Sequence, residues 1–300
     1  MTTKPLSFSQ VPFIECGVAE KDFRFNRVYR GGLGVAGFAA LLLISTPVLA
    51  ATAPALGTIS SYAVVTDTLN NTNPTVINGD LCYNILGGGI PTVTGGTGTY
   101  TGACTTTPLT DQTTALGVLT GQACTDITAL AGGGTNPLTL NTVVVPGGTP
   151  AGTFPPGCYT SNAIPMRVGA GAVTLSGAGV YIFKTGAALD TAAGTSVGVA
   201  AGACENDVFW APGGATTLTG TSFVGNILSD NAITVAAGGT VSGRLLGYLG
   251  VLTTSGNTIT KPSCTTVYPA SIPTLSEWAM IIFALLLVGL GLQMQRRRQA

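Results

Sequence analysis

Short apolar runs separated by Gly-Thr or Gly-Asn turns recur four times between about Val168 and Thr260. After a longer first interval that contains Cys204, the turn returns roughly every 17 to 19 residues, close to one coil of a parallel β-solenoid. A single coil is too small to bury an apolar face, so it must stack on its neighbours. The recurrence therefore predicts a β-helix. The four turns begin at Gly194, Gly220, Gly239 and Gly256.

The residue types in this region suit strands and corners. Thr and Val have stiff β-branched side chains that pack well on a pleated surface, and the 43 glycines can form the turns. Apolar positions alternate in twos and threes between glycines, whereas a helix would show a period of 3.6. A β-sandwich and a low-complexity Gly/Thr segment are the alternatives, and the matching phase and type of the four turns favour the solenoid.

The period changes over residues 107–131, where one amphipathic helix is predicted to lie along the solenoid. Thr107 can cap its start, and Asp111 faces the positive end of the helix dipole. Gly117 and Gly121 would permit close contact with the solenoid, at some cost in helix propensity. A loop with a short helix is the alternative. The residues on the predicted apolar face are Leu109, Leu116, Leu119, Ala123, Ile127 and Leu130.

The N-terminus has the pattern of an export signal. Basic residues precede an apolar run over residues 31–49, and small residues of the kind that signal peptidase accepts follow it. Cleavage after Ala50 would make residues 1–50 a signal peptide, and an uncleaved anchor is the alternative.

Cleavage there removes Cys16 and leaves six of the 7 cysteines, an even number that predicts disulfides in an exported chain. Six cysteines allow fifteen pairings, which the sequence does not separate. Histidine is absent and no Cys-x-x-Cys spacing occurs, so a zinc site is not expected. The six are Cys82, Cys104, Cys124, Cys158, Cys204 and Cys264.

Charge is sparse between residues 54 and 270, where eight acidic and four basic side chains give a net charge of −4. No basic patch forms, which argues against nucleic acid as a partner. The 45% hydrophobic content is enough to bury a core and argues against disorder.

The C-terminus combines a polar linker (residues 262–271) with an apolar segment. Residues 278–294 are just long enough to cross a bilayer as a helix, with Trp278 at one interface and three arginines (residues 296–298) on the cytoplasmic side. This arrangement places the domain of residues 51–261 outside the cell. The membrane is expected to hold the protein only through its terminal segments.

The end of the chain resembles the IPTL-type C-terminal sorting signals of Gram-negative bacteria over about its last thirty residues, with Ala279 where Gly is common in such tails. The resemblance implies that residues 272–300 are handled by an exosortase-type membrane protease. The protein would then be exported to the cell surface or extracellular matrix after a transient stay on the inner membrane. The motif residues are Ile272, Pro273, Thr274, Leu275, Glu277 and Trp278.

Residues 54–260 resemble the ice-binding protein family of polar bacteria, fungi, algae and yeasts. The resemblance implies an irregular, mainly β, right-handed parallel β-helix of triangular section with one long α-helix alongside. The six cysteines and an apparent insertion over residues 199–204 depart from the family pattern. The segments that carry the match are Asn206 to Trp210, Thr221 to Leu228, Ile233-Thr234, Thr240 to Leu246 and Asn257 to Thr260, with Ile77 to Leu81 and Pro156 to Tyr159 earlier in the chain.

Ice offers neither charge nor a pocket, so a protein that binds it needs a regular face whose hydroxyl and methyl groups order surface water. Thr carries both groups on a stiff side chain, and stacked strands arrange such side chains in a grid. A dense threonine set over residues 92–101 is interpreted instead as a capping loop before the helix. The candidate face is Thr191, Thr195, Thr217, Thr219, Thr221, Thr234, Thr240, Thr253 and Asn257.

Two other functions compete with ice binding. An enzyme would need clustered carboxylates and bases, and Asp190, Glu205, Asp207 and Asp230 are accompanied by no histidine. A surface adhesin or extracellular-matrix protein that binds polysaccharide would be expected to show exposed aromatic side chains, and Trp210 lies in a core-like run. The sequence therefore favours ice as the partner, with no catalysis and no cofactor.

Overall fold

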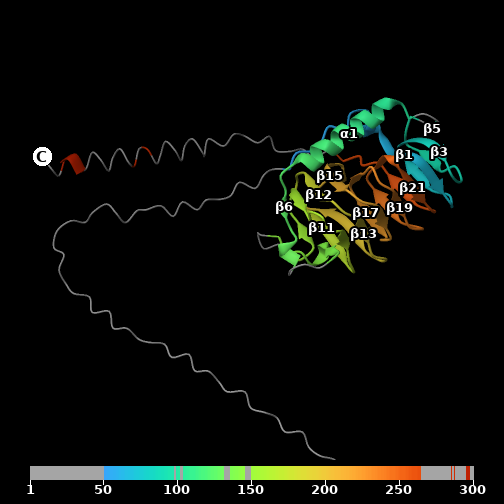
Figure 1. The fold of residues 1–300 in the computed structure, drawn as a ribbon. Coiled ribbons are helices and arrows are strands. Elements are labelled where there is room, and N and C mark those ends of the chain that lie inside the picture. Colours follow the sequence, from blue (N-terminus) through green and yellow to red (C-terminus); the bar gives the residue numbers. More distant parts are fainter. Residues whose placement is uncertain are drawn as a thin grey trace, which may run out of the picture. The chain divides into compact units, whose positions relative to one another are not determined.

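The computed structural model describes residues 51–264, except residues 98, 102–103, 132–135 and 146–149, together with residues 285, 287 and 295–297 (Figure 1). The predicted signal peptide (residues 1–50) and most of the predicted sorting tail and membrane helix (residues 278–294) lie outside the described residues. Within the part of the chain that the structure describes, no helix is both long and apolar enough to cross a membrane.

Parallel strands make three faces of a solenoid, and each full coil contributes one strand to each face. We call the 8-stranded sheet the open face. Its strands, in spatial order, are β4 (Thr92–Thr94), β2 (Val76–Asn78), β22 (Thr258–Thr260), β20 (Thr240–Ser242), β17 (Ser222–Val224), β14 (Ser196–Ala200), β11 (Ala172–Ser176) and β8 (Thr153–Phe154).

The 14-stranded sheet supplies the other two faces, because its long strands β21 (Leu245–Thr254) and β1 (Tyr62–Asn71) turn a corner. The helix face consists of β6 (Thr125–Asp126), β9 (Gly157–Thr160), β12 (Tyr181–Thr185), β15 (Val208–Pro212), β18 (Asn226–Leu228), the first halves of β21, β1 and β3 (Asp80–Leu86), and β5 (Thr99–Thr101). The narrow face consists of β7 (Leu138–Thr139), β10 (Met166–Val168), β13 (Leu189–Thr191), β16 (Thr216–Leu218), β19 (Ile233–Val235) and the second halves of β21 and β1. Short 3-10 turns are η1 (Gly57–Ser61), η2 (Ala129–Ala131), η3 (Leu140–Thr142) and η4 (Glu205–Asp207).

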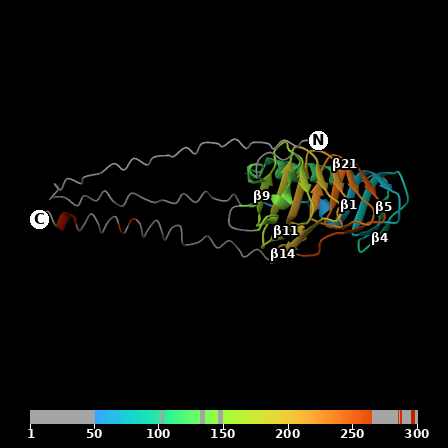
Figure 2. The same cartoon turned by 90° about the horizontal axis from the view of Figure 1, so that it is seen from below.

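The coils do not stack in chain order. β1 pairs with β21 and β2 pairs with β22, so the first coil of the domain lies directly on the last one. Figure 2 shows the N-terminal strands beside the C-terminal ones at one end of the stack. The sequence repeats predicted the coils, but they gave no sign of this crossover.

Aromatic rings fill the centre of the solenoid. Phe183 stacks on Trp210 with ring centroids 4.3 Å apart, and Phe154 and Phe223 extend the contact to either side. Trp210 is fully buried and donates its Nε1 proton to the Val224 carbonyl at 2.9 Å. The prediction that Trp210 belongs to the core is confirmed, and burial of such rings is a large apolar contribution to stability.

Helix α1 (Thr106–Gly121) lies along the helix face, where it contacts β12, β15, β18 and β21 (Figure 1). Its buried side is a stripe with helical spacing. This stripe closes a second apolar cluster between the helix and the sheet. The stripe consists of Pro108, Gln112, Ala115 and Leu119.

The predicted helix over residues 107–131 starts within one residue of the observed helix but ends too late. The predicted cap is wrong, because Thr107 lies inside α1 and the N-cap residue is Thr105, whose side chain makes no capping hydrogen bond. After Gly121 the chain extends, Cys124 bonds to Cys158, and β6 pairs with β9. Ile127 is fully buried in the solenoid core, so its apolar character reflects the coil rather than the helix. The close contact predicted at Gly117 and Gly121 is also wrong, because a Cβ at either position would meet nothing within 4 Å.

The six predicted cysteines form three disulfides, and the structure selects one of the fifteen pairings: Cys82–Cys104, Cys124–Cys158 and Cys204–Cys264. The first ties β3 to the residues just before α1, and the second ties the residues after α1 to β9. Together these two bridges fix both ends of the helix on the sheet.

Candidate functional site

The open face is a regular surface of the solenoid. Its strand pairs keep one register, whereas the register shifts where β1 meets β21 and β3. Neighbouring strands in a sheet lie about 4.8 Å apart, and alternate residues along a strand lie about 6.6 to 7 Å apart. The outward side chains therefore form a two-dimensional grid.

Two columns of side chains make this grid, and they flank an inward apolar column of the core. The first column is Thr92, Val76, Thr258, Thr240, Ser222, Ser196 and Ala172. The second, two residues further along each strand, is Thr94, Asn78, Thr260, Ser242, Gly198 and Thr174, and Thr153 continues it on β8. It is interrupted at β17, where Val224 is buried in the core.

Hydrogen bonds hold several of these side chains in place. Asn78 links its neighbours on both sides, because it accepts a hydrogen bond from the Thr94 hydroxyl and donates one to Thr260 Oγ1 at 3.0 Å. Thr240 Oγ1 donates to the Thr221 carbonyl at 3.0 Å. Restricted χ1 angles add to this order, so the grid is preorganised.

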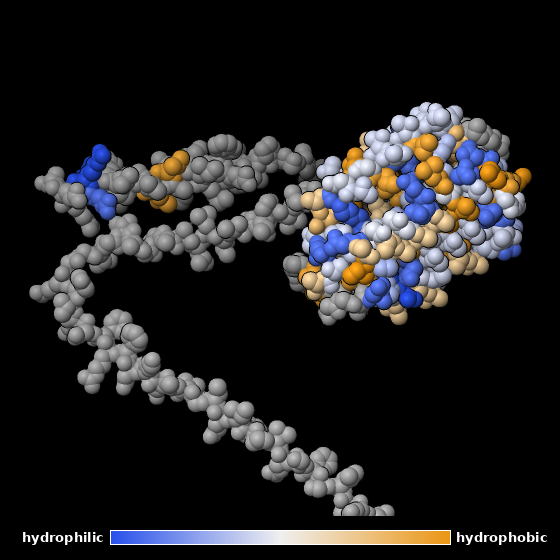
Figure 3. All heavy atoms as spheres, viewed as in Figure 1, coloured by the Kyte–Doolittle hydropathy of each residue, from blue (hydrophilic) through white to orange (hydrophobic). Residues whose placement is uncertain are grey.

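None of the residues in the two columns is charged. The narrow face differs, since Arg167 and Asp190 point outward on neighbouring strands and form an ion pair at 3.3 Å. In Figure 3, residues of intermediate hydropathy cover much of the visible surface, with hydrophilic and hydrophobic residues scattered among them.

The predicted ice-binding residues do not share one surface. Only Thr240 belongs to the open-face columns, and Thr221 lies directly before β17 at its edge. Three others, Thr217, Thr234 and Thr253, line up in register on the narrow face. Thr219 follows β16 at the corner and is exposed.

The remaining three candidates are buried at corners. Thr191 Oγ1 accepts hydrogen bonds from the N–H groups of Thr219 and Gly220, at 2.9 and 2.8 Å. Thr195 donates its hydroxyl to the Ala192 carbonyl at 2.7 Å. Asn257 is 1% exposed and bonds three backbone groups. These side chains stabilise turns and do not reach the surface.

Most of the open-face residues were missed by the sequence reasoning. Thr92 and Thr94, interpreted there as part of a capping loop, form β4 at one end of the open face. The signal that could have found them is a hydroxyl residue on one or both sides of a single apolar residue. It occurs in Thr92-Val93-Thr94, Ser196-Val197, Ser222-Phe223, Thr240-Val241-Ser242 and Thr258-Ile259-Thr260.

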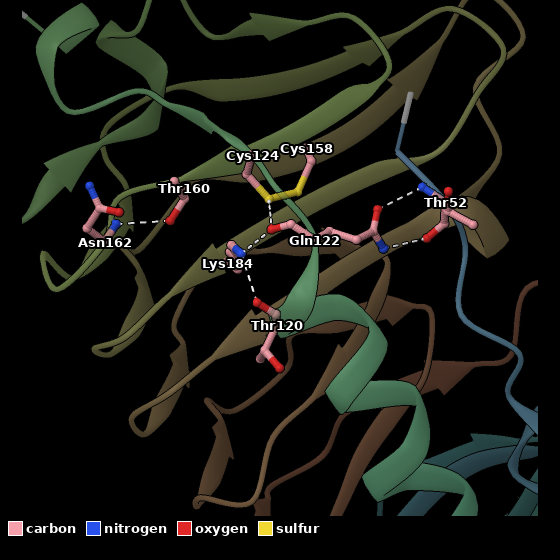
Figure 4. Close-up of a disulfide and its surroundings, with 8 residues drawn as sticks. All are labelled: Thr52, Thr120, Gln122, Cys124, Cys158, Thr160, Asn162 and Lys184. Atoms are coloured by element: carbon pink, nitrogen blue, oxygen red, sulfur yellow. Dashed lines mark hydrogen bonds between the residues drawn. A yellow bond between two sulfur atoms is a disulfide. The ribbon is translucent and has the colours of Figure 1, made fainter. Parts of the chain in front are cut away.

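Polar contacts also secure the C-terminal end of α1 (Figure 4). Lys184 Nζ donates to the carbonyls of Thr120 and Gln122, where a cation complements the helix dipole. Burial lowers the pKa of Lys184. The Gln122 amide bonds both the N–H and the carbonyl of Thr52, at 2.9 and 2.7 Å.

Arg244 is the one buried cation among the described residues. Its guanidinium donates to the Ser60 carbonyl and to the side-chain carbonyls of Asn206 and Asn226. Burial lowers its pKa to about 10. Its bonds join η1 to the corner before β15, which is a structural role.

The carboxylates considered for catalysis lie in three separate places. Asp190 is on the narrow face, and Glu205 and Asp207 form part of η4. Asp230 borders a cavity of about 350 Å³ beside α1. Cys204, Glu205 and Cys264 lie close together, but the two sulfurs are joined in a disulfide and are not free thiolate ligands.

Fold and surface together define the class of protein: a three-sided parallel β-solenoid with an external helix and a regular, uncharged, hydroxyl-lined sheet. The chain belongs to the family described as Ice-binding-like, which matches residues 63–260. Residues 270–298 match the IPTL-CTERM motif, as the sequence predicted.

Relatives of known sequence and structure agree with this assignment. An ice-binding protein of Nostoc sp. (strain HG1) is 29% identical over 261 residues, which cover 82% of this chain and 89% of that protein. An ice-binding protein of Flavobacterium frigoris (strain PS1) is 35% identical over 167 residues, 53% of this chain and 55% of that protein. The crystal structure of an ice-binding protein from the Antarctic ascomycete Antarctomyces psychrotrophicus has 29% identity and a TM-score of 0.57, over 71% of this chain and all of that one. An ice-binding protein from an Antarctic biological consortium has 26% identity and a TM-score of 0.59, over 71% of this chain and 93% of that one.

Proposed function

We propose that this protein adsorbs to ice through its open face and acts without catalysis. The observation that carries the proposal is the grid itself: seven neighbouring strands, β4 to β11, place outward residues in two columns, interrupted only at the buried Val224 of β17, without a charge among them. Relatives named as ice-binding proteins support the choice of ligand.

Ice presents a repeating array of water molecules, so the binding surface must repeat as well. Each Thr hydroxyl can donate one hydrogen bond and accept two, and its methyl group restricts the positions open to adjacent water. Rows about 4.8 Å apart and columns about 6.6 to 7 Å apart hold such waters in a two-dimensional order. A fixed grid loses little conformational entropy on binding, which favours adsorption.

Most threonines of the open face lie at one end of the stack, and Thr174 and Thr153 lie at the other. Thr92, Thr94, Thr258, Thr260 and Thr240 lie on three of the four strands from β4 to β20, whereas serine, alanine and glycine dominate from β17 to β14. Adsorption is therefore expected to depend most on the end built from the first and last coils.

The terminal segments fit an exported protein. Residues 1–50 would act as a signal peptide, and residues 278–294 would form a helix that holds the protein briefly on the inner membrane. An exosortase-type protease would then process the tail near the IPTL motif, which residues 270–298 match. The solenoid would work at the cell surface or outside the cell.

The test compares two matched double variants of the purified, oxidised protein. Thr240→Tyr with Thr258→Tyr places two large side chains on neighbouring open-face strands, and Thr217→Tyr with Thr234→Tyr does the same on the narrow face. We expect the first pair to abolish thermal hysteresis and ice recrystallisation inhibition, because the rings hold ice away from the grid. The second pair should leave both unchanged.

Melting temperature is measured for all proteins to show that folding is intact. An equal loss of ice activity in both double variants would reject the open face as the binding surface. An inactive parent protein would reject ice binding and direct attention to the adhesin alternative, which a glycan-binding screen then tests.

A further inference from the structure

A short strap, residues 261–264, leaves the end of the open face and turns back across the solenoid. Lys261 donates its N–H to the Asn78 carbonyl at 2.9 Å, and Pro262 is buried. Cys264 then bonds to Cys204, with 5.9 Å between their Cα atoms. The strap thus joins the last strand of the domain to a residue 60 positions earlier.

This bridge crosses two steps of the stack. β22 lies next to β20, and β20 lies next to β17. Cys204 directly precedes η4 and β15, which belong to the same coil as β17. The covalent link therefore connects the coil of β22 to the interior coil of β15, and it bypasses the coil between them.

We propose that the strap and its disulfide act as a mechanical clamp, which passes tension from the C-terminal tail to the interior of the solenoid. This inference rests on the proposed function: the open face binds ice, while the segment beyond Cys264, before or after processing near the IPTL motif, attaches the protein at the cell surface. Tension applied beyond Cys264 reaches Cys204 through covalent bonds. The segment between the two cysteines, which carries β17, β20 and β22, then bears none of the pull.

Without the clamp, the same tension would act first on β22. This strand has only three residues, and its hold on β2 and β20 consists of short parallel ladders. Peeling it away would remove Thr258 and Thr260, which stand at the threonine-rich end of the grid. The clamp protects the part of the face on which adsorption is expected to depend most.

Single-molecule force spectroscopy on the full-length chain tests the clamp. One handle is attached at Ala300 and the other at Ala178, an exposed turn residue between β11 and β12. In the Cys204→Ala, Cys264→Ala double variant we expect an early event, at lower force than any in the parent protein. The freed segment of 60 residues adds up to about 200 Å of extension.

The matched control removes a different bridge, Cys124–Cys158, which lies outside the segment between the handles. Its force traces should keep the parent pattern. The clamp would be overturned if the Cys204 and Cys264 variant unfolded in one step at the force of the parent protein, or if the control gained the same early event.

A measurement without load separates this inference from ice binding. Ice recrystallisation inhibition of the unloaded Cys204→Ala, Cys264→Ala protein should equal that of the parent. If neither protein inhibits recrystallisation while the early force event is present, ice binding fails and the clamp stands.

Discussion

The open face and the narrow face are built from the same kind of short parallel strand, yet they differ in what they present. Strands β2, β4, β20 and β22 of the open face carry two outward residues each, and those of the narrow face from β10 to β19 carry one. The narrow face also contains the Arg167–Asp190 ion pair. All of these strands have three residues, so the phase of inward and outward positions turns a single row into a grid. That phase is the difference between an ordinary solenoid side and a surface that can match a crystal.

Two adjacent residues where β22 begins should differ strongly in their contribution to stability, and this is the biggest difference we predict. Asn257 is buried and bonds Ser255 N–H and two carbonyl groups, so Asn257→Ala should cost about 3 kcal/mol of unfolding free energy. Thr258 is exposed, so Thr258→Ala should change stability by less than about 0.5 kcal/mol and lower ice activity. Denaturant unfolding and thermal hysteresis measure the two effects. Equal stability changes would contradict the assignment of inward and outward positions.

Stability, which depends on the core, and ice activity, which depends on the grid, should respond differently to pH. Burial raises the pKa of Tyr159 and Tyr181, so the unfolded chain releases these phenolic protons first, near pH 10. The stabilisation is complete below that pH and is lost as pH rises toward the folded-state pKa values. Ice activity should stay constant between about pH 5 and 9, because no grid residue ionises in that range.

Thermal unfolding from pH 7 to 11 measures the loss of stability, and Tyr181→Phe should make the decline shallower. An ice activity that titrates near neutral pH would contradict the uncharged grid.

A smaller gain is expected from filling a gap in the grid. Gly198 lies in the second column, and a Cβ there would meet nothing within 4 Å. Gly198→Thr should raise ice activity, and it should stabilise the fold by about 0.5 to 1 kcal/mol through the unfolded state. Gly117→Ala on α1 is the control, since it also has free space but lies away from the open face. The ice activity of the Gly117→Ala variant should equal that of the parent. A gain in ice activity in this control would show that the effect at Gly198 does not depend on its place in the grid.

The smallest effect is expected on the narrow face. The side chains of Arg167 and Asp190 are 42% and 40% exposed, so water screens their ion pair. Arg167→Ala should therefore change stability by no more than about 1 kcal/mol. Ice activity should not change. Ice adsorption that weakens in this variant would show that the narrow face takes part.

The solenoid could be predicted from the sequence because its turns repeat in phase, and the start of α1 could be predicted from Thr and Pro near its first turn. The site was harder to predict because inward and outward positions alternate within the turn itself. Thr195 and Asn257 follow the turn glycine and point into the corner, whereas Ser196 and Thr258, one residue later, point outward. A shift of one residue moves a side chain to the other side of a sheet.

The threonine-rich end was missed for a different reason. β4 and β2 belong to the first coils of the chain, and they join the grid only because β2 pairs with β22. Contacts between residues 182 positions apart, such as Asn78 with Thr260, leave no trace in a local repeat. The sequence therefore indicated the type of surface but not its members.

Because the first coil stacks on the last, the open face of a newly made chain can be completed only at the end of synthesis and export. A chain is synthesised and exported from its N-terminus, so β2 emerges long before β22 can pair with it. Until residues 258–260 arrive, the grid exists only as two unconnected pieces. A truncated or half-exported chain thus lacks the complete ice-matching surface, and the last strand to arrive is the one that completes it.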